Sequence, residues 1–419
     1  MTLERPYLFG GRDIYWFLLV CALFAAISLS VEYFHYIKLT TFDDVLIDAE
    51  VVHQYSKTKK EKNYQVLKLR TDDGVQFYTT GSKHLRDLQG YRLQLVIRTN
   101  RLSYLDYLKG FFAYSKILKV YPQKSMKRRL SEQIASGHSE KNMQQIYGAL
   151  FTASPMDQTL RIQLSSLGIS HLLAISGFHL GVLSFILFLL LKPLYALLQH
   201  FYFPYRHSRR DIFIMTIVLL FAYVWFLDFV PSLVRAFAMM AVGFILYDRG
   251  VRLISIQSLM VVILLLLSLW PRLFFALGFW LSVSGVFFIL LFLQHFSHWD
   301  KFRQFIGLHI WIYAMMLPLS FFLFQTFSPL HPLSVLWTML FILFYPAVLL
   351  LHIVGYGSLL DTLLAGLLNQ GIPSEVTVEV YVVLLQFLLA FAAVRYKKAL
   401  LLLLIVTFAV FVGAVYQIA

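Results

Sequence analysis

Long apolar stretches separated by short polar loops fill most of the chain. The first covers residues 14–34, and none follows until residue 171. Further runs of roughly membrane-spanning length, about 20 residues, then lie near 171–191, 212–230, 232–247, 254–269, 273–294, 305–324, 333–353, 377–394 and 399–418. The pattern predicts a polytopic α-helical membrane protein with about ten spans, some of them broken or re-entrant.

The first apolar run has two interpretations. Arg12 precedes it and small residues fill its middle, as in a cleaved signal peptide. Its length and the aromatic end at Tyr33, Phe34 and Tyr36 favour an uncleaved anchor. We therefore expect an N-terminal anchor helix within residues 1–37.

The run that begins at residue 171 is interrupted. It reads HLLAISGFHLGVLSF, with Ser176 and Gly177 flanked by His171 and His179. Helix-breaking and polar residues at membrane depth are tolerated where they line a water-filled cavity or meet protein. The segment predicts a broken helix beside a pathway. Close helix contact at the Ser-Gly pair, and capping or packing by the histidines, are the alternatives.

Between the first two runs, apolar and polar residues alternate with the period of β-strands. Val45 to Val52, Leu67 to Arg70, Val75 to Thr80 and Tyr91 to Arg98 follow this pattern, and a final short strand is expected at 117–121. Four or five short strands within about 80 residues predict a small OB-like β-barrel over residues 38–122. Residues 123–170 predict amphipathic interfacial helices, and residues 171–419 a multi-span domain.

Composition supports a membrane protein. The chain is 59% hydrophobic and only 14% charged, and Cys21 is its single cysteine. One thiol gives no intrachain disulfide and no thiol pair for zinc or redox chemistry. We expect no cofactor, no metal and no catalytic residues.

The net charge of +14 is concentrated in one place: residues 38–130 hold 19 Lys and Arg against 9 Asp and Glu. Basic residues in the loops 192–210, 247–252 and 295–303 predict that these loops are cytoplasmic. The basic module then lies outside, where such charge indicates a polyanionic partner, nucleic acid or anionic lipid. Arg395, Lys397 and Lys398 would also lie outside, unless a segment between 333 and 372, with 355–370 the strongest candidate, enters and leaves on one side.

One face of the predicted barrel combines basic and aromatic residues, which suits single-stranded nucleic acid: the backbone follows the charges and the bases stack on rings. The alternative is a solvated face that keeps the module soluble. The residues assigned to this face are Lys68, Arg70, Phe77, Tyr78, Arg92 and Arg98.

Further polar residues lie in the later spans. Arg235, four residues after Pro231, either pairs with Asp228 or contacts phosphate from the pathway. Ser282 and Ser284 lie near Gly278 and Gly285, and small residues at this spacing also serve helix packing. The candidate pathway residues are His171, Ser176, Gly177, His179, Ser232, Arg235, Ser282 and Ser284.

Three segments resemble the ComEC family of competence proteins, the inner-membrane DNA channels of natural transformation. They are GALFTASPMDQTLRIQLSSLGISHLLAISGFHLGVLS at 148–184, PSLVRA at 231–236 and GFWLSVSG at 278–285. Their order and spacing, with the outer module, extend the resemblance over about residues 14–350. Many members continue into a metallo-β-lactamase-like domain, but no His-x-His-x-Asp-His run occurs in this sequence, so nuclease activity is not expected here.

The resemblance implies a channel, rather than an enzyme, that carries single-stranded DNA across the bacterial cytoplasmic membrane. It implies as partners a periplasmic DNA receptor, a cytoplasmic ATPase or single-strand-binding proteins, and a separate nuclease; a homo-oligomer is also open. A secondary transporter or a lipid or polysaccharide exporter with a periplasmic accessory domain is the main alternative, and a membrane scaffold is a third. A transporter predicts carboxylates at the membrane midplane, and the spans contain almost none.

Overall fold

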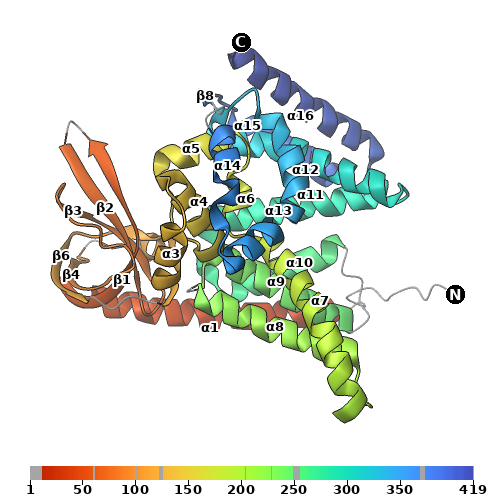
Figure 1. Ribbon diagram of the computed structural model, residues 1–419. Helices are drawn as coiled ribbons and strands as arrows, with labels where there is room; N and C mark the ends of the chain where they lie inside the picture. The colour runs from red at the N-terminus through yellow and green to blue at the C-terminus, as the bar shows by residue number, and fades with distance from the viewer. Residues whose placement is uncertain are drawn as a thin grey trace. The chain divides into compact units, whose positions relative to one another are not determined.

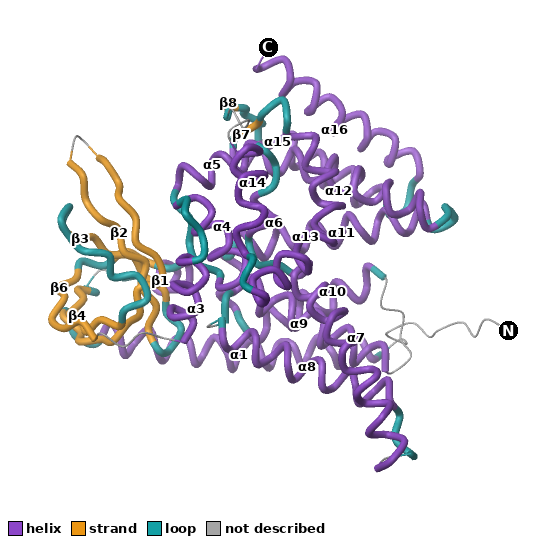
Figure 2. The backbone as a smooth tube through the Cα atoms, in the orientation of Figure 1, coloured by secondary structure: helices purple, strands orange, loops and turns teal. Residues whose placement is uncertain are grey.

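The computed structural model describes residues 12–59, 62–100, 102–121, 126–202, 204–227, 229–248, 255–368 and 373–418. Its chain contacts define two compact units. The N-terminal unit comprises residues 7–132 with 260–280, and the helical unit comprises residues 133–259 with 281–419. Figure 1 labels most helices and strands of both units, and Figure 2 separates helices from strands by colour.

The N-terminal unit joins one long helix to a mixed sheet. The first predicted apolar run forms helix α1. This helix is 28 residues long and apolar enough to cross a bilayer. The elements are α1 (Asp13–Thr40), β1 (Asp44–Lys59), β2 (Lys62–Thr71), β3 (Gln76–Gly81), β4 (Arg92–Arg98), α2 (Tyr104–Lys109), β5 (Phe111–Phe112), β6 (Ser115–Tyr121), the start of α3 (Met126–Ser136), most of α10 (Ile256–Leu269) and the 3₁₀ turn η1 (Pro271–Phe275).

The sheet has six strands in the order β5-β3-β2-β1-β4-β6. Strand β1 is long because its first half pairs with β4 and its second half with β2. A tight hairpin turn at 71–74 joins β2 to β3. The Gly74 amide donates to the carbonyl of Thr71 at 2.9 Å, and Gly74 has a φ of +76°, a conformation that glycine adopts without strain.

Strands β5 and β6 lie at the two ends of this order, so strand pairing alone does not close the sheet into the expected barrel. The chain nevertheless passes directly from one edge to the other. The amide of Ala113 donates to the carbonyl of Tyr78 in β3, and the amide of Arg98 in β4 donates to the carbonyl of Tyr114. Both edges of the sheet are therefore bonded to one short, continuous segment.

The alternation seen in the sequence sets the core of this unit. Leu67, Leu69, Leu93, Leu95 and Ile97 are fully buried, as the period-two pattern predicted. Helix α2 was not predicted. Its residues Tyr107 and Leu108 pack into the same core beside Phe111.

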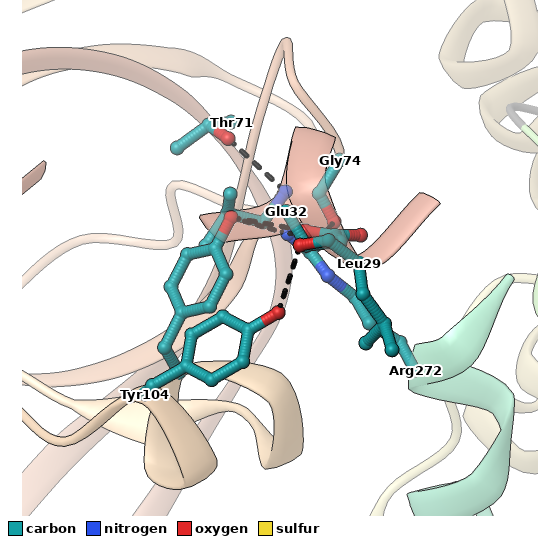
Figure 3. A network of polar contacts seen from close by, with 8 residues as sticks. Leu29, Glu32, Thr71, Gly74, Tyr104 and Arg272 are labelled. Carbon is teal, nitrogen blue, oxygen red and sulfur yellow. Dashed lines mark hydrogen bonds and ion pairs between the residues drawn. The ribbon is translucent and has the colours of Figure 1, made fainter. Parts of the chain in front are cut away.

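A polar network ties α1 to α2 and to η1 within this unit (Figure 3). The Arg272 guanidinium pairs with the Glu32 carboxylate and donates to the Tyr107 hydroxyl at 2.7 Å and the Gly74 carbonyl at 2.9 Å. Tyr104 donates from its hydroxyl to the Leu29 carbonyl at 3.1 Å. Burial raises the pKa of Tyr107, so its hydroxyl keeps the proton that it donates to Glu32.

The helical unit is almost entirely α-helical. Its elements are α4 (Lys141–Thr152), α5 (Gln158–Ser166), α6 (Ser170–Leu173), α7 (Gly177–Tyr202), α8 (Ser208–Phe226), α9 (Pro231–Asp248), α11 (Leu277–Phe296), α12 (Lys301–Phe324), β7 (Thr326–Phe327), η2 (His331–Leu333), α13 (Ser334–Val354), η3 (Gly357–Leu360), α14 (Asp361–Leu368), β8 (Ser374–Glu375), α15 (Val380–Ala393) and α16 (Lys397–Ile418).

Within the described ranges, six helices are long and apolar enough to cross a membrane, α1 in the N-terminal unit and five in the helical unit. Helices α9, α10, α14 and α15 are apolar but shorter. Each predicted apolar run contains a helix. The chain therefore fits a polytopic membrane protein.

Helices of the 123–170 region differ from one another. The apolar residues Met126 and Leu130 of α3 are exposed, as an interfacial helix requires. In contrast, Met143, Ile146, Tyr147 and Leu150 of α4 are buried in a core shared with α13 and α14. The apolar edge of α4 is thus covered by protein.

Two contacts bear on the basic loop after α15. Strand β7 pairs with β8, so the segment between them, which holds α13 and α14, starts and ends at the same place. At the other end of α15, the Gln294 amide donates to the Val394 carbonyl at 2.8 Å, beside the end of α11. Arg395 to Lys398 therefore lie at the same end as the basic loop 295–303, as the positive-inside pattern requires.

Candidate conduit site at the interrupted helix

The interruption predicted from the sequence is present. Helix α6 ends at Leu173, Ala174 adopts an extended conformation with ψ of 121°, and α7 begins at Gly177. The Ala174 amide still donates to the Ser170 carbonyl, and the Ser176 carbonyl accepts from the Leu180 amide, but the carbonyls of Ala174 and Ile175 lack the regular helical bonding that a lipid-facing span needs. Side chains or water must satisfy their backbone groups.

Ser176 and His179 cap the new helix reciprocally. The Phe178 amide donates to the Ser176 hydroxyl at 3.3 Å, and the Ser176 amide donates to Nδ1 of His179 at 3.2 Å. This is a capping box in which histidine occupies the position that glutamate or glutamine usually takes. The capping alternative for His179 is therefore observed.

The cap fixes the proton of His179. Because Nδ1 accepts from a backbone amide, the neutral ring carries its proton on Nε2. The His179 side chain is 1% exposed, its ring contacts Phe341 and Tyr345, and Nε2 has no hydrogen-bond partner among the described residues. A buried donor without a partner is costly, which makes Nε2 a candidate ligand contact.

Helix α9 packs directly on the interruption. The Ser232 hydroxyl donates to the carbonyl of Ile175 at 2.8 Å, one of the groups that the break sets free. A Cβ added to Gly177 would lie 3.3 Å from the Cβ of Ala236. The two sequence segments 171–179 and 231–236 therefore meet, and Gly177 permits the close helix contact that was the alternative for the Ser-Gly pair.

Arg235 lies between these two contacts on α9. Its side chain is 8% exposed, and its Nε has no hydrogen-bond partner among the described residues. Asp228, the expected ion-pair partner, lies outside the described residues. The described part of the chain thus presents a buried cation without an acidic partner, an arrangement that phosphate would satisfy.

The segment from η2 into α13 forms the other side of the break, and sequence reasoning did not assign it a role. An added Cβ at Gly168, which has a φ of +71°, would come within 3.0 Å of the His331 ring. His331 is buried and bonds through Nδ1 to the Tyr313 hydroxyl at 3.0 Å. His171 is exposed, and its Nε2 lies 3.4 Å from the Thr338 hydroxyl.

Ser282 and Ser284 of α11 have no described contact with the break. Ser284 is buried and Ser282 is half-buried. A Cβ at the neighbouring Gly285 would meet no atom within 4 Å, so glycine is not needed there for a close helix contact within the described structure. Their assignment to the pathway stays a prediction.

The basic face of the N-terminal unit is largely neutralised. Each of its arginines faces a carboxylate: Arg70 pairs with Glu50 at 3.6 Å, Arg98 with Asp44 at 3.2 Å, and Arg92 with Asp72. Such pairs are typical of a solvated face.

The two aromatic residues assigned to that face, Phe77 and Tyr78, lie on opposite sides of β3. Lys68 lies opposite Tyr78, 5.8 Å above its ring, and burial raises the pKa of the Tyr78 phenol. Phe77 is buried, and its ring stacks on the Phe111 ring with 5.6 Å between the centroids. The prediction that Phe77 stacks on bases is therefore wrong. Neighbouring residues of a strand point to opposite faces, and Tyr78 points outward.

A second polar cluster, the His138 cluster, was also missed. His138 is buried, and its Nδ1 lies 2.8 Å from the Asp361 carboxylate while its Nε2 lies 3.1 Å from Nε2 of His352. His352 bonds through Nδ1 to the Val348 carbonyl at 2.8 Å, and the Tyr147 ring stacks on His138.

The acceptors fix the protons of this cluster. A carbonyl only accepts, so Nδ1 of His352 donates and its Nε2 accepts from His138. His138 then donates from Nε2, and its Nδ1 lies against the Asp361 carboxylate. Only two histidine nitrogens converge, and within the described ranges no three His, Cys, Asp or Glu side chains form a group suited to a metal ion.

Residues 152–419, more than half of the chain, match the sequence model of a family described as Competence protein. The matched region contains the interruption, α9 and the α13 face. No curated protein and no solved structure matches the chain significantly.

Proposed function

Because the chain belongs to the competence protein family, we propose that it forms the conduit through which single-stranded DNA crosses the bacterial cytoplasmic membrane in natural transformation. The family match supports a role in competence. The site at the interrupted helix is the basis for the finer assignment.

One observation carries this proposal. Two buried donor atoms, Nε2 of His179 and Nε of Arg235, lack partners among the described residues, and both residues belong to segments that contact the break at Ala174 to Ser176. Apolar surroundings do not retain such groups unless something satisfies them. Phosphate oxygens accept hydrogen bonds and carry negative charge, so a DNA backbone suits both donors.

The two donors have complementary roles in this proposal. Arg235 offers a fixed charge with a planar set of N–H groups that matches a phosphate. The neutral His179 donates one hydrogen bond without adding charge, which would limit how tightly each phosphate is held. A DNA strand must leave each contact as it advances. The residues that would border its path are Ser176, Gly177, Ser232 and His171.

For the N-terminal unit we propose an OB-type barrel outside the membrane. Its support is the continuous segment 111–121, which bonds to β3 at its start and to β4 thereafter, with α2 placed before it. This unit would receive the strand from a periplasmic DNA receptor. A cytoplasmic ATPase or strand-binding proteins would draw it inward, and a separate nuclease would remove the other strand.

A thiol-labelling experiment tests the conduit. His171 and Ala174 are exposed, whereas Leu172 and Leu173 between them are buried. An exposed side chain can face either lipid or water. A charged thiol reagent distinguishes the two cases, because it does not enter hydrocarbon. In a Cys21→Ser background, we expect His171→Cys and Ala174→Cys to react with a charged, membrane-impermeant reagent, and the control Leu173→Cys to remain unlabelled.

A DNA-import assay tests the activity. In cells without this protein, labelled DNA should reach the outer compartment and fail to enter the cytosol. Persistent cytosolic entry would contradict the proposed function. Failure of both introduced cysteines to react from either side of the membrane would contradict the position of the conduit.

A further inference from the structure

The segment β5–β6 presents aromatic and basic side chains on its outer surface. Phe112 and Tyr114 are 50% and 72% exposed, and their rings form an edge-to-face pair at 5.1 Å. Ala113 between them is buried, and Lys116 is exposed, so the period-two alternation turns Phe112, Tyr114 and Lys116 to the same side.

A β-bulge extends this surface. Ile117 pairs with Leu95 and Lys119 with Gln94, which leaves Leu118 as the extra residue. Lys119 is therefore exposed as Lys116 is, and its ammonium lies 4.9 Å above the Tyr121 ring. We call Phe112, Tyr114, Lys116, Lys119 and Tyr121 the β6 surface.

The charge of the β6 surface differs from that of the arginine-bearing face. Arg70, Arg92 and Arg98 each face a carboxylate, whereas Lys116 and Lys119 have no carboxylate within 4.0 Å among the described residues. The strand residues opposite them, Val96 and Gln94, are uncharged. A phosphate that binds at the lysines displaces no existing ion pair.

We propose that the β6 surface, and not the arginine-bearing face, is where the N-terminal unit binds single-stranded DNA. Exposed rings stack on bases of any sequence, and lysines beside them contact the backbone phosphates. This inference rests on the proposed function, because it assigns the contact surface for the transported strand. An anionic membrane surface and an added strand from a protein partner are the competing occupants.

The test uses the full-length protein in uncharged nanodiscs and a fluorescent oligothymidine. The double variant F112A/Y114A should bind roughly 10- to 100-fold more weakly with little change in salt dependence. The double variant K116Q/K119Q should bind more weakly and lower the slope of log affinity against log salt by about 1.4. The matched control R70Q/R98Q should bind as the native protein does.

Conservative and lipid controls keep the result interpretable. The variant F112Y/Y114F keeps both rings and should bind as the native protein does. An unchanged thermal unfolding midpoint of F112A/Y114A excludes loss of folding as the cause of its weaker binding. Unchanged binding by F112A/Y114A, or a loss of binding confined to R70Q/R98Q, would overturn the proposal. Unchanged DNA binding with weakened binding to anionic vesicles would assign the β6 surface to the membrane instead.

The import assay separates this inference from the proposed function. If deletion abolishes cytosolic entry of DNA while the β6 variants bind and import normally, only the assignment of the β6 surface fails. If deletion leaves cytosolic entry intact, the proposed function fails, whatever the oligonucleotide measurements give.

Discussion

The hydroxyl of Ser232 donates a hydrogen bond of 2.8 Å to the carbonyl of Ile175, across 57 positions of the chain. This bond satisfies a backbone acceptor that the break between α6 and α7 sets free. It also ties α9 to the break at the point where Arg235 follows one turn later. The open backbone is therefore held in a defined geometry.

Replacing Ser232 tests that bond. Ser232→Ala leaves the Ile175 carbonyl without its partner, which should cost roughly 1–3 kcal/mol of unfolding free energy. We expect a lower midpoint of thermal unfolding in detergent and reduced DNA import. Ser232→Thr keeps the hydroxyl and serves as the control; an equal loss in both variants would contradict the role of the hydrogen bond.

Gly177 should be sensitive to added volume, and Gly181, one turn later in the same helix, should not. The Cβ of a residue at 177 would lie 3.3 Å from Ala236, whereas nothing lies within 4 Å at 181. We expect Gly177→Val to destabilise by roughly 1–3 kcal/mol through overpacking. Gly181→Ala should stabilise by about 0.5–1 kcal/mol through helix propensity.

The two glycines are compared by thermal unfolding midpoints and by import. Because Val disfavours helix slightly, Gly181→Val is the matched control for the larger side chain. Equal losses at the two positions would show that the contact between α7 and α9 is not tight.

Arg235 should separate stability from function. Its buried charge lacks a partner among the described residues, so Arg235→Met removes a desolvation penalty while it preserves much of the side-chain volume. We expect an unfolding midpoint equal to or above that of the native protein, together with loss of DNA import. A strong fall in stability would instead indicate a structural ion pair, as expected for Asp228.

The sequence predicted the break, and the buried side of strands such as β4, because both depend on local pattern. A Ser-Gly pair within an apolar run weakens a helix wherever it occurs, and alternation at Leu93, Leu95 and Ile97 sets which side of β4 is buried. The prediction for the aromatic residues failed at Phe77 for a related reason. Phe77 and Tyr78 are neighbours in β3, so only one of them can face outward.

Contacts between distant segments were beyond local pattern. His331 and Thr338 reach the break from more than 150 positions away, and no periodicity marks them. The pairing of Arg98 with Asp44 depends on β1 lying beside β4, which the order of strands along the chain does not reveal. The His138 cluster likewise joins three segments that are separate in sequence.

The Arg272–Glu32 pair should hold the N-terminal unit together. Both side chains are about four-fifths buried, so loss of one partner leaves a poorly solvated charge. We expect Arg272→Met or Glu32→Gln to destabilise by roughly 1–3 kcal/mol, less than a fully buried pair because solvent screens part of the interaction. The double variant should lose less than the sum of the single variants in thermal unfolding; strict additivity would show that the residues do not interact.

The His138 cluster predicts a stability effect at Asp361. Asp361→Asn replaces the carboxylate that faces Nδ1 of the buried His138 by an amide, which is a weaker hydrogen-bond partner. We expect a loss of roughly 1–3 kcal/mol of unfolding free energy, because a buried polar group is left with a poorer partner. Asp44→Asn, which removes an exposed carboxylate paired with the exposed Arg98, is the control and should change stability less. Thermal unfolding of the two variants at one scan rate measures the difference. An unfolding midpoint for Asp361→Asn equal to that of the native protein would show that the contact between Asp361 and His138 does not stabilise the fold.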